Sequence, residues 1–359
     1  MDKRTTISDI AKALEISTGT VHRALHDHSR VSAVTKARVL QMARELEYRP
    51  NLAARYLSSG RQLRISVNLL QGITSYFHEV AAGIIEEAKS MGGENVDVQQ
   101  RFYPRIGQGE QEAFAAALDA NVDGIITWTG EPQKISTLMR RASRNNTPVV
   151  CVTSDAPNSG RLALVSIDTF ASGAIAADLM GLTLRGIGKV AITMAEASTV
   201  EHAEKLRSFE NTLHSLYPGV HMLPPIEDRN IASLAYEKCS RLFSEHPDLG
   251  GIYVTTDASI PVIRAARDLG LANKMTIVAT DLFPELINEI KSGAVNATIF
   301  QRPKGQGRLA FKVLYEFLCY GKCPHSRLTL IPHLITRGSL ESISRRLLQG
   351  NGFIKGTTD

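Results

Sequence analysis

The stretch TISDIAKALEISTGTVHRAL, residues 6–25, decides how the N-terminal part of the chain folds, because it carries two helix-start signals. Thr6 and Asp9 have the spacing of a capping box, in which each residue satisfies an N–H group of the other. The apolar residues behind them share one helical face: Ile7, Ile10, Ala11 and Leu14. Ser17 then caps a second helix, which runs from Thr18 to Leu25.

The second helix has an apolar and a polar side. The residues expected to face inward are Val21, Ala24 and Leu25, and those expected outside are Thr18, Gly19, His22 and Arg23. A third helix begins at the cap Ser32, and its expected buried face consists of Val34, Leu40, Ala43 and Leu46. Two short helices joined by a tight turn, the second presenting polar side chains, are typical of a helix-turn-helix that enters the DNA major groove.

The basic charge of the chain is concentrated at its N-terminal end. Residues 1–64 hold 12 Lys and Arg against 6 Asp and Glu, whereas the remaining residues hold 29 against 30. A local positive field favours a polyanion such as DNA. The nearly neutral remainder suits a small uncharged ligand or a protein partner.

From Arg61 onward, short apolar runs alternate with helix-length segments, which indicates βαβ units. Strands are expected at 63–70, 96–102, 122–128, 148–153, 190–194, 251–254 and 275–279, and the first helices at 77–91, 110–120 and 132–145. A second series starts near Ser172, so we expect two α/β lobes with parallel sheets. Ligands in such folds bind outside the carboxyl ends of the strands, in the crevice between the lobes.

A series of short motifs runs along residues 5–61. They are Ile10-Ala11, Ile16-Ser17, Thr20-Val21, Arg23-Ala24-Leu25, Val31-Ser32, Thr35, Arg38-Val39, Leu46-Glu47-Tyr48-Arg49-Pro50-Asn51 and the following Ala54-Arg55-x-Leu57. In order and spacing they resemble the DNA-binding head and hinge of the lactose-repressor (LacI/GalR) family of bacterial regulators. In that family the hinge forms a short helix in the minor groove. The resemblance implies that Leu57 wedges into a base step beside its mate from a second subunit.

The resemblance also implies a set of DNA-contacting residues. They are Thr5, Thr6, Ser17, Thr18, Gly19, Thr20, His22, Arg23, Ser32, Asn51, Ala54 and Leu57. Arg23 is expected to bind O6 and N7 of guanine, and His22 to contact either a base or a phosphate. The hydroxyls at helix starts fit caps better than base readers, although a cap can also hold a phosphate. Gly19 offers the groove only its backbone.

A second set of motifs extends from the first expected strand to Ser339. It comprises Thr153-Ser154-Asp155, Val165-Ser166-Ile167-Asp168, Lys205-Leu206-x-Ser208-Phe209, Ala279-Thr280-Asp281, Thr298-Ile299-x-Gln301-x-Pro303 and Pro332-x-Leu334-Ile335-x-Arg337-Gly338-Ser339. These motifs resemble the sugar-binding periplasmic proteins and the effector domain of the same repressor family. The implied organisation is a helix-turn-helix domain (1–50), a hinge helix and linker (51–61), two periplasmic binding protein type I-like lobes (62–345) and a flexible tail (346–359). Lobe 1 would take 62–167 plus 299–327, and lobe 2 168–298 plus 328–345.

A sugar or polyol needs hydroxyl acceptors, donors and flat aromatic faces at the strand ends. The resemblance implies that these come from Tyr76, Phe77, Trp128, Asp155, Arg161, Lys205, Thr256, Asp257, Asp281 and Gln301. Lys205 stands where most relatives carry an Arg, so a point donor replaces a fork, which Arg161 or Arg207 would have to supply. Asp257 is either a ligand contact or a helix cap, and Trp128 either lines the cleft or fills the core.

Other functional classes find little support. Cys151, Cys239, Cys319 and Cys323 are too sparse for a disulfide framework, and Cys319, Cys323 and His325 lack a fourth zinc ligand. No nucleophile elbow, phosphate-binding loop or dinucleotide fingerprint occurs, so we expect neither an enzyme nor a cofactor. The first residues lack the apolar run of a signal peptide, and no run reaches the roughly 20 apolar residues of a membrane span. We therefore expect a cytoplasmic protein.

These observations predict a homodimeric, sequence-specific DNA-binding repressor whose affinity for a pseudo-palindromic operator changes when a sugar or polyol binds between the lobes. Two-fold protein symmetry would be copied into the half-sites of the operator. A regulator whose ligand promotes DNA binding, as co-repressor or activator, remains an alternative. A sugar-binding protein without a gene-regulatory role fits the N-terminal head less well.

Overall fold

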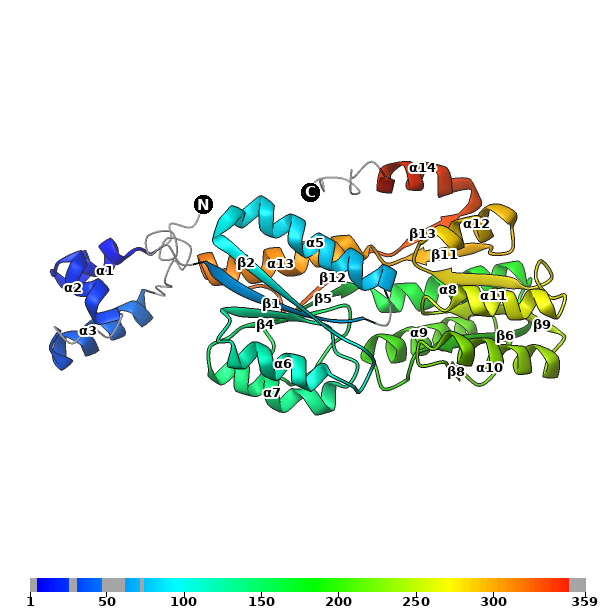
Figure 1. Ribbon diagram of the computed structural model, residues 1–359, viewed down its shortest axis with the longest axis horizontal. Coiled ribbons are helices and arrows are strands. Elements are labelled where there is room, and N and C mark those ends of the chain that lie inside the picture. Colours follow the sequence, from blue (N-terminus) through cyan, green and yellow to red (C-terminus); the bar gives the residue numbers. More distant parts are fainter. Residues whose placement is uncertain (1–4, 26–30, 47–61, 72–73, 349–359) are drawn as a thin grey trace. The chain divides into compact units, whose positions relative to one another are not determined.

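The computed structural model of the chain describes residues 5–25, 31–46, 62–71 and 74–348 (Figure 1). A small N-terminal unit holds the first three helices, and a large unit begins at Gln62. The hinge expected at 51–61 lies outside the described residues. Within the described ranges, no helix is both long and apolar enough to cross a membrane.

The N-terminal head consists of α1 (Ile7–Leu14), α2 (Thr18–Leu25) and α3 (Ala33–Glu45). The expected capping box is present, because the Asp9 amide donates to the Thr6 hydroxyl and the Asp9 carboxylate accepts from the Thr6 amide at 2.8 Å. The Ser17 hydroxyl accepts from the Thr20 amide at 3.1 Å, and Ser32 caps α3. Local sequence therefore sets where all three helices begin.

The expected buried face of α3 is wrong at two positions. Val34 is 72% exposed and Leu40 39% exposed, whereas Val39 and Ala43 are buried. The inward stripe runs through 39, 42, 43 and 46, the spacing of one helical face. Val34 and Leu40 project from other sides of the helix, about 140° and 100° from Val39. The buried core of the head consists of Ile10, Ala11, Val21, Ala24, Val39 and Ala43.

The first lobe of the large unit is built on a parallel sheet with strand order β12-β5-β4-β3-β1-β2. Its strands are β1 (Leu63–Leu70), β2 (Val96–Tyr103), β3 (Gly124–Thr127), β4 (Val149–Val152), β5 (Ala163–Ile167) and β12 (Arg327–Leu330). Its helical elements are α5 (Thr74–Gly92), the 3₁₀ turn η1 (Gly93–Asn95), α6 (Glu110–Asp119), α7 (Pro132–Arg144) and α13 (Pro303–Tyr320). Figure 1 shows α5 and α13 on one side of this sheet and α6 and α7 on the other. The central strands β3, β4 and β5 are buried throughout, which explains their nearly continuous apolar sequences, whereas the edge strands β2 and β12 are only partly buried and more polar.

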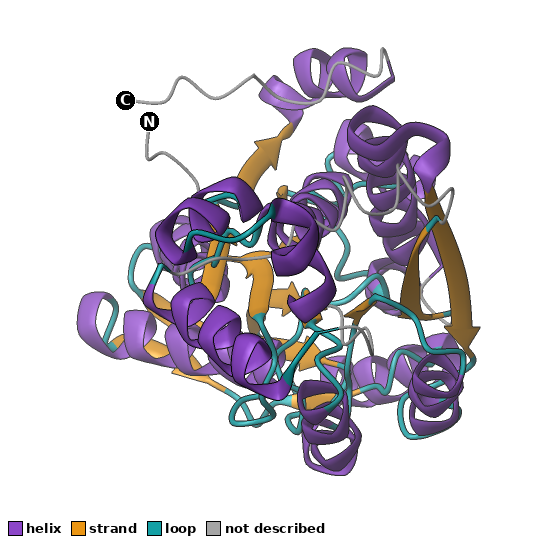
Figure 2. Ribbon diagram, turned by 90° about the vertical axis from the view of Figure 1, so that its left-hand side faces the viewer, coloured by secondary structure: helices purple, strands orange, loops and turns teal. Residues whose placement is uncertain are grey.

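The second lobe is built on a sheet with strand order β13-β11-β10-β9-β6-β7, and β8 pairs with β6. Its strands are β6 (Ile187–Met194), β7 (Gly219–Met222), β8 (Ile226–Glu227), β9 (Leu249–Val254), β10 (Thr276–Thr280), β11 (Ala297–Phe300) and the antiparallel β13 (His333–Thr336). Its helices are α8 (Thr169–Thr183), α9 (Val200–Leu216), α10 (Ala232–Glu245), α11 (Ser259–Asp268), α12 (Pro284–Ser292) and α14 (Arg337–Leu348). Figure 2, viewed from the left-hand side of Figure 1, shows helices around the strands.

The chain passes between the lobes after β5, after β11 and after β12. The first crossing agrees with the expected boundary at Ile167, but the other two fall later. β11 remains in the second sheet as far as Phe300, and β12 remains in the first sheet as far as Leu330. The positions of these two crossings depend on which strands pair with each other, and the apolar runs of the sequence do not show that pairing. α14 also extends to Leu348, so the first residues of the expected tail are helical.

Candidate functional site

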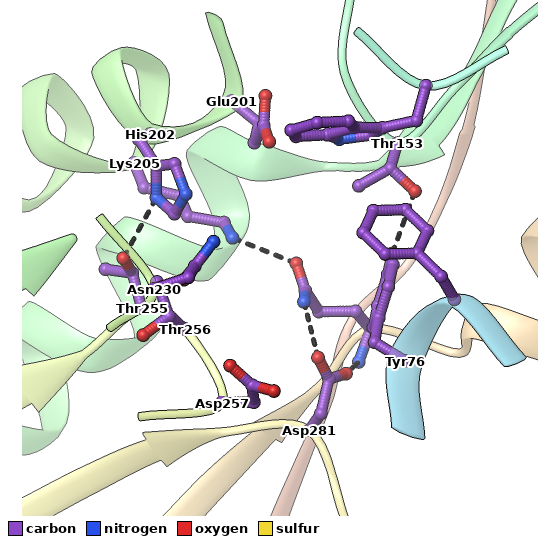
Figure 3. Close-up of a pocket in the computed structure, with 13 residues that line it drawn as sticks. Tyr76, Thr153, Glu201, His202, Lys205, Asn230, Thr255, Thr256, Asp257 and Asp281 are labelled. Atoms are coloured by element: carbon purple, nitrogen blue, oxygen red, sulfur yellow. Dashed lines mark hydrogen bonds between the residues drawn. The ribbon is translucent and has the colours of Figure 1, made fainter. Parts of the chain in front are cut away.

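A cavity lies where strand ends of the two lobes face each other, and it contains about 430 Å³ of unfilled space, open solvent included (Figure 3). The cavity is lined by Tyr76, Phe77, Trp128, Thr153, Glu201, His202, Lys205, Asn230, Thr255, Thr256, Asp257, Asp281 and Gln301. Aromatic residues come from lobe 1, and all the charged lining residues come from lobe 2.

Four of the polar lining residues stand at or shortly after the ends of parallel strands. Thr153 follows β4, Asp257 follows β9 through two threonines, Asp281 follows β10 and Gln301 follows β11. Thr153 and Asp281 have φ angles of 69° and 65°, which side chains other than glycine adopt at an energetic cost. This backbone conformation turns the chain sharply at the sheet edge, where both side chains lie on the cavity.

Helix α9 brings three further ionisable groups to the cavity from its first turns. Glu201 and Lys205 are four residues apart on one face, and His202 lies beside them. All three are buried, and Lys205 is only 2% exposed. Gly173 of α8 permits this position, because a Cβ atom there would lie 2.3 Å from the Lys205 carbonyl oxygen.

A chain of hydrogen bonds connects α9 to the ends of β10 and β11. The Lys205 ammonium donates to Gln301 Oε1 at 2.9 Å, and Gln301 Nε2 donates to Asp281 Oδ2 at 2.7 Å (Figure 3). The Gln301 amide also donates to Asp281 Oδ1 at 3.0 Å. Lys205 and Asp281 are thus held apart by one amide side chain, which leaves further donor and acceptor positions for a ligand.

A second set of bonds ties lobe 1 to Gln301. Gln306 Nε2 donates to the Tyr76 hydroxyl at 2.9 Å and to the Gln301 carbonyl at 2.8 Å, and its Oε1 accepts from Thr153 at 3.0 Å. Tyr76 must therefore donate its proton to Thr153 Oγ1, 2.9 Å away. This closed ring orients the Tyr76 side chain. Phe77 packs edge-on against both Tyr76 and Trp128, with ring centroids 5.1 and 5.3 Å apart, and together they form an aromatic wall.

Burial controls the charges at the site. Desolvation raises the pKa of Asp281 to about 6, against which the hydrogen bonds from Gln301 act, and it raises the pKa of Asp257 to about 6. Burial likewise raises the pKa of Glu201 and lowers that of Lys205, although each charge favours the other. Burial, together with the Lys205 charge, keeps the pKa of His202 well below its usual range, so its imidazole is neutral.

Most of the expected effector residues are brought together, but Asp155 and Arg161 are not among the cavity lining. Asp155 is held by Arg161, whose Nη2 donates to it at 2.9 Å and whose Nε also contacts it, and Arg161 Nη1 donates to the Ser326 carbonyl at 2.6 Å. The guanidinium fork that the sequence left available is thus used within lobe 1. Arg207 is also absent from the lining.

Sequence reasoning missed Thr153, Glu201, His202 and Asn230 as lining residues, and Gln306 behind them. One available signal was the Glu201-to-Lys205 spacing, since a glutamate four residues before a lysine shares its helical face. Trp128 both fills the core and lines the cavity, because its side chain is only 3% exposed and still borders the open space. Among the described residues, no group of three or more His, Cys, Asp or Glu is arranged to hold a metal ion.

In the head, the residues expected to contact DNA have two kinds of environment. Thr18, Gly19, His22 and Arg23 are exposed on α2, whereas Thr6, Ser17 and Ser32 act as caps. The Thr5 hydroxyl donates to the Leu46 carbonyl at 2.7 Å, which joins the chain start to the end of α3, and Arg23 donates to Thr20 at 3.4 Å. Asn51, Ala54 and Leu57 lie outside the described residues.

Comparison with known proteins assigns both parts of the chain. Residues 6–51 match the model of bacterial regulatory proteins of the lacI family, and residues 66–323 match a periplasmic binding protein domain. The HTH-type transcriptional regulator DegA of Bacillus subtilis (strain 168) is 24% identical over 269 residues, which cover 75% of this chain and 78% of DegA. Catabolite control protein A of Priestia megaterium is 26% identical over 281 residues, or 77% and 82% of the two chains.

Solved structures resemble the large unit. The glucose-galactose binding protein GanP from Geobacillus stearothermophilus shares 25% identity and a TM-score of 0.71 over 77% of this chain and 99% of its own. A solute binding protein from Burkholderia graminis C4D1M in complex with D-arabinose has a TM-score of 0.73 at 23% identity, covering 79% and 98%. The two family models, the two-lobed fold and the regulator relatives all point to the same kind of protein. The chain therefore belongs to the lacI family of bacterial regulatory proteins, as a DNA-binding transcriptional regulator whose ligand-controlled part is a periplasmic binding protein domain.

Proposed function

We propose that this regulator is a cytoplasmic, homodimeric repressor that holds a pseudo-palindromic operator, and that a sugar or sugar-like polyol bound in the cavity changes its operator affinity. The observation that carries the proposal is the cavity itself. It lies at the strand ends of both lobes and combines an aromatic wall with hydroxyl acceptors and donors. The glucose-galactose binding protein GanP, with the same fold, supports a sugar as the ligand.

The lining suits a polyol because each type of ligand atom finds a partner. Asp281 supplies carboxylate oxygens, Lys205 and Gln301 supply donors and acceptors, and Thr256 adds a hydroxyl. The aromatic wall of Tyr76, Phe77 and Trp128 offers apolar surface for C–H faces. Asp155 and Arg161 are not part of this proposal, since they bind each other.

Control by the ligand requires that it bind one arrangement of the lobes more tightly than another. Hydrogen bonds between the lobes stabilise one such arrangement. Arg327 of β12 donates to Glu204 of α9 at 2.7 and 3.0 Å, and Glu204 also accepts from Thr169 of α8. A ligand that contacts α9 and the lobe 1 aromatic wall at once would favour the arrangement in which these links are made.

For the head we propose base contacts from Arg23 and His22 of α2, which are exposed on one side of the helix. By the family resemblance, the hinge residues Asn51, Ala54 and Leu57 contact the minor groove, with Leu57 as the wedge. We predict that Leu57→Ala weakens operator binding and leaves ligand binding intact. A gel-shift titration beside a thermal-shift assay separates the two properties, and unchanged operator affinity would remove the wedge role.

The cavity is tested by screening purified protein against sugars and polyols in a thermal-shift assay, followed by gel shifts with and without each compound that stabilises it. Asp281→Ala is expected to abolish ligand-induced stabilisation. Normal stabilisation of this variant would refute the cavity assignment. Release of operator by the ligand supports an inducible repressor, whereas tighter binding would indicate a co-repressed regulator or an activator.

A further inference from the structure

The charges that line the cavity do not balance. Among its described lining residues, Glu201, Asp257 and Asp281 are acids, and Lys205 is the strong base. His202 adds no charge, because burial and the neighbouring Lys205 keep its pKa well below the usual range, and its Nδ1 lies 3.0 Å from the Thr255 hydroxyl. The cavity therefore has an excess of carboxylates.

Two of the three carboxylates have partners that partly stabilise their negative charge. Asp281 accepts twice from Gln301 and senses the Lys205 charge. Glu201 also senses Lys205, and the Ser154 hydroxyl and the Trp128 indole favour its charged form. Glu201 is nonetheless 94% buried, and no hydrogen bond of normal geometry from the described residues reaches its Oε2.

Asp257 is the carboxylate left over. The sequence allowed it to be a helix cap, but the N-cap of α11 is Ala258, and the Ala258 amide donates to the Thr256 hydroxyl at 3.2 Å. No described side chain forms a hydrogen bond or an ion pair with the Asp257 carboxylate, which Figure 3 shows beside the open part of the cavity. Its charge acts on two other carboxylates, Asp228 and Asp281, and raises the pKa of both.

We propose that the effector carries a protonated amine that pairs with Asp257, in addition to hydroxyl groups that contact Asp281 and Gln301; the ligand class is thus an aminated sugar or polyol. The inference rests on the proposed role of the cavity as the effector site. The hydroxyl groups of a neutral ligand would donate hydrogen bonds to Asp257 but would leave its negative charge without a counter-charge beside two like charges, once the ligand has displaced water. An ammonium group neutralises that charge, and the aromatic wall tolerates both C–H faces and a cation.

The test compares matched neutral and aminated compounds with the full-length protein by isothermal titration at pH 7.5. Suitable pairs are D-glucose with D-glucosamine, D-galactose with D-galactosamine, and D-glucitol with 1-amino-1-deoxy-D-glucitol. We expect an aminated compound to bind at least tenfold more tightly than its neutral partner. Asp257→Asn should remove this preference, whereas Asp119→Asn, the same charge change at a position with a 68% exposed side chain on lobe 1, should keep it.

A measurement without ligand provides a second check. Because Asp257 repels Asp228 and Asp281, Asp257→Asn should raise the melting temperature of the empty protein, as expected for a residue kept for binding rather than stability. A structural role would instead lower it.

Equal affinity within every pair, binding of no aminated compound, or a lowered melting temperature of Asp257→Asn would each overturn the inference. If a neutral sugar binds and changes operator affinity, the proposed function stands and the amine is refuted. If an aminated compound binds through Asp257 but leaves the operator affinity unchanged, recognition of an amine stands and the proposed regulatory role of the cavity is refuted.

Discussion

Replacing Lys205 with methionine tests whether the buried charges between α9 and the strand ends form one energetic unit. Lys205 is 2% exposed, donates to Gln301 at 2.9 Å, and lies near Glu201 and Asp281. Methionine retains most of the volume of the side chain and removes the charge. The substitution therefore leaves two buried carboxylates without their cation, and it leaves Gln301 Oε1 without its donor.

The expected cost follows from this loss. Lys205 forms no direct ion pair with the described carboxylates, so its removal is a milder case of breaking a buried ion pair, which typically destabilises a protein by roughly 3–5 kcal/mol. The lysine itself is buried at a cost, as the lowered pKa of Lys205 indicates, so we expect the lower end, about 3 kcal/mol. At roughly 2–4 °C per kcal/mol for a domain of this size, the melting temperature should fall by about 6–12 °C.

A double-mutant cycle makes the reasoning refutable. Glu201→Gln removes one of the stranded carboxylates, so the double variant should be more stable than the two single effects predict, by roughly 1–3 kcal/mol. Unfolding by urea and by heat measures each corner. Lys134→Met, at a position with a 57% exposed side chain, is the control and should leave the stability nearly unchanged. Strictly additive single effects, or an unchanged Lys205→Met protein, would show that these charges do not act together.

Three other expectations can be measured independently. Gly173→Ala should lower the melting temperature and weaken ligand binding together, because the new Cβ would meet the Lys205 carbonyl at 2.3 Å and push α9 away from α8; binding at wild-type affinity would contradict this. Val39→Ala should destabilise the head by about 1–3 kcal/mol, whereas Val34→Ala, at a site 72% exposed, should change little; circular dichroism melting of the two variants decides it. The pKa of Asp281 is raised to about 6, so its protonated form stabilises the fold at low pH and this contribution is lost as the pH rises through about 6. Between pH 5 and 7.5 the wild type should therefore lose about 1 kcal/mol relative to Asp281→Asn, and parallel stability profiles of the two proteins would be incompatible with that pKa.

The sequence predicted the secondary structure well where a helix start or a strand depends only on residues close to it in the chain. The capping residues Thr6, Ser17 and Ser32 fix helix starts, because a side-chain oxygen bonds to an amide only three residues away. The first strand, Leu63–Leu70, agrees residue for residue, since a run buried on both faces needs no knowledge of its neighbours. Val34 and Leu40 failed because apolar character does not say which side of α3 faces the core.

The residues of the site were only partly predictable from the sequence. Residues placed by their own strand could be predicted, whereas residues placed by partners far away in the chain could not. Asp257, Asp281 and Gln301 could be proposed because each follows a recognisable strand, and parallel strands end at one edge of a sheet. Gln306 could not, because its ring with Tyr76 and Thr153 joins residues up to 230 positions apart.

The sequence by itself determined the kinds of parts this protein has: a capped three-helix head, two alternating α/β lobes, and polar residues at the ends of strands. Those properties depend on contacts within one turn or one strand, which the order of residues specifies directly. Only the tertiary structure decided which charges meet. It joined Arg161 to Asp155 within lobe 1, brought the Lys205 charge close to Glu201 and Asp281, and left Asp257 at the cavity without a cation from the described residues. Electrostatic pairing depends on distance in space and not along the chain.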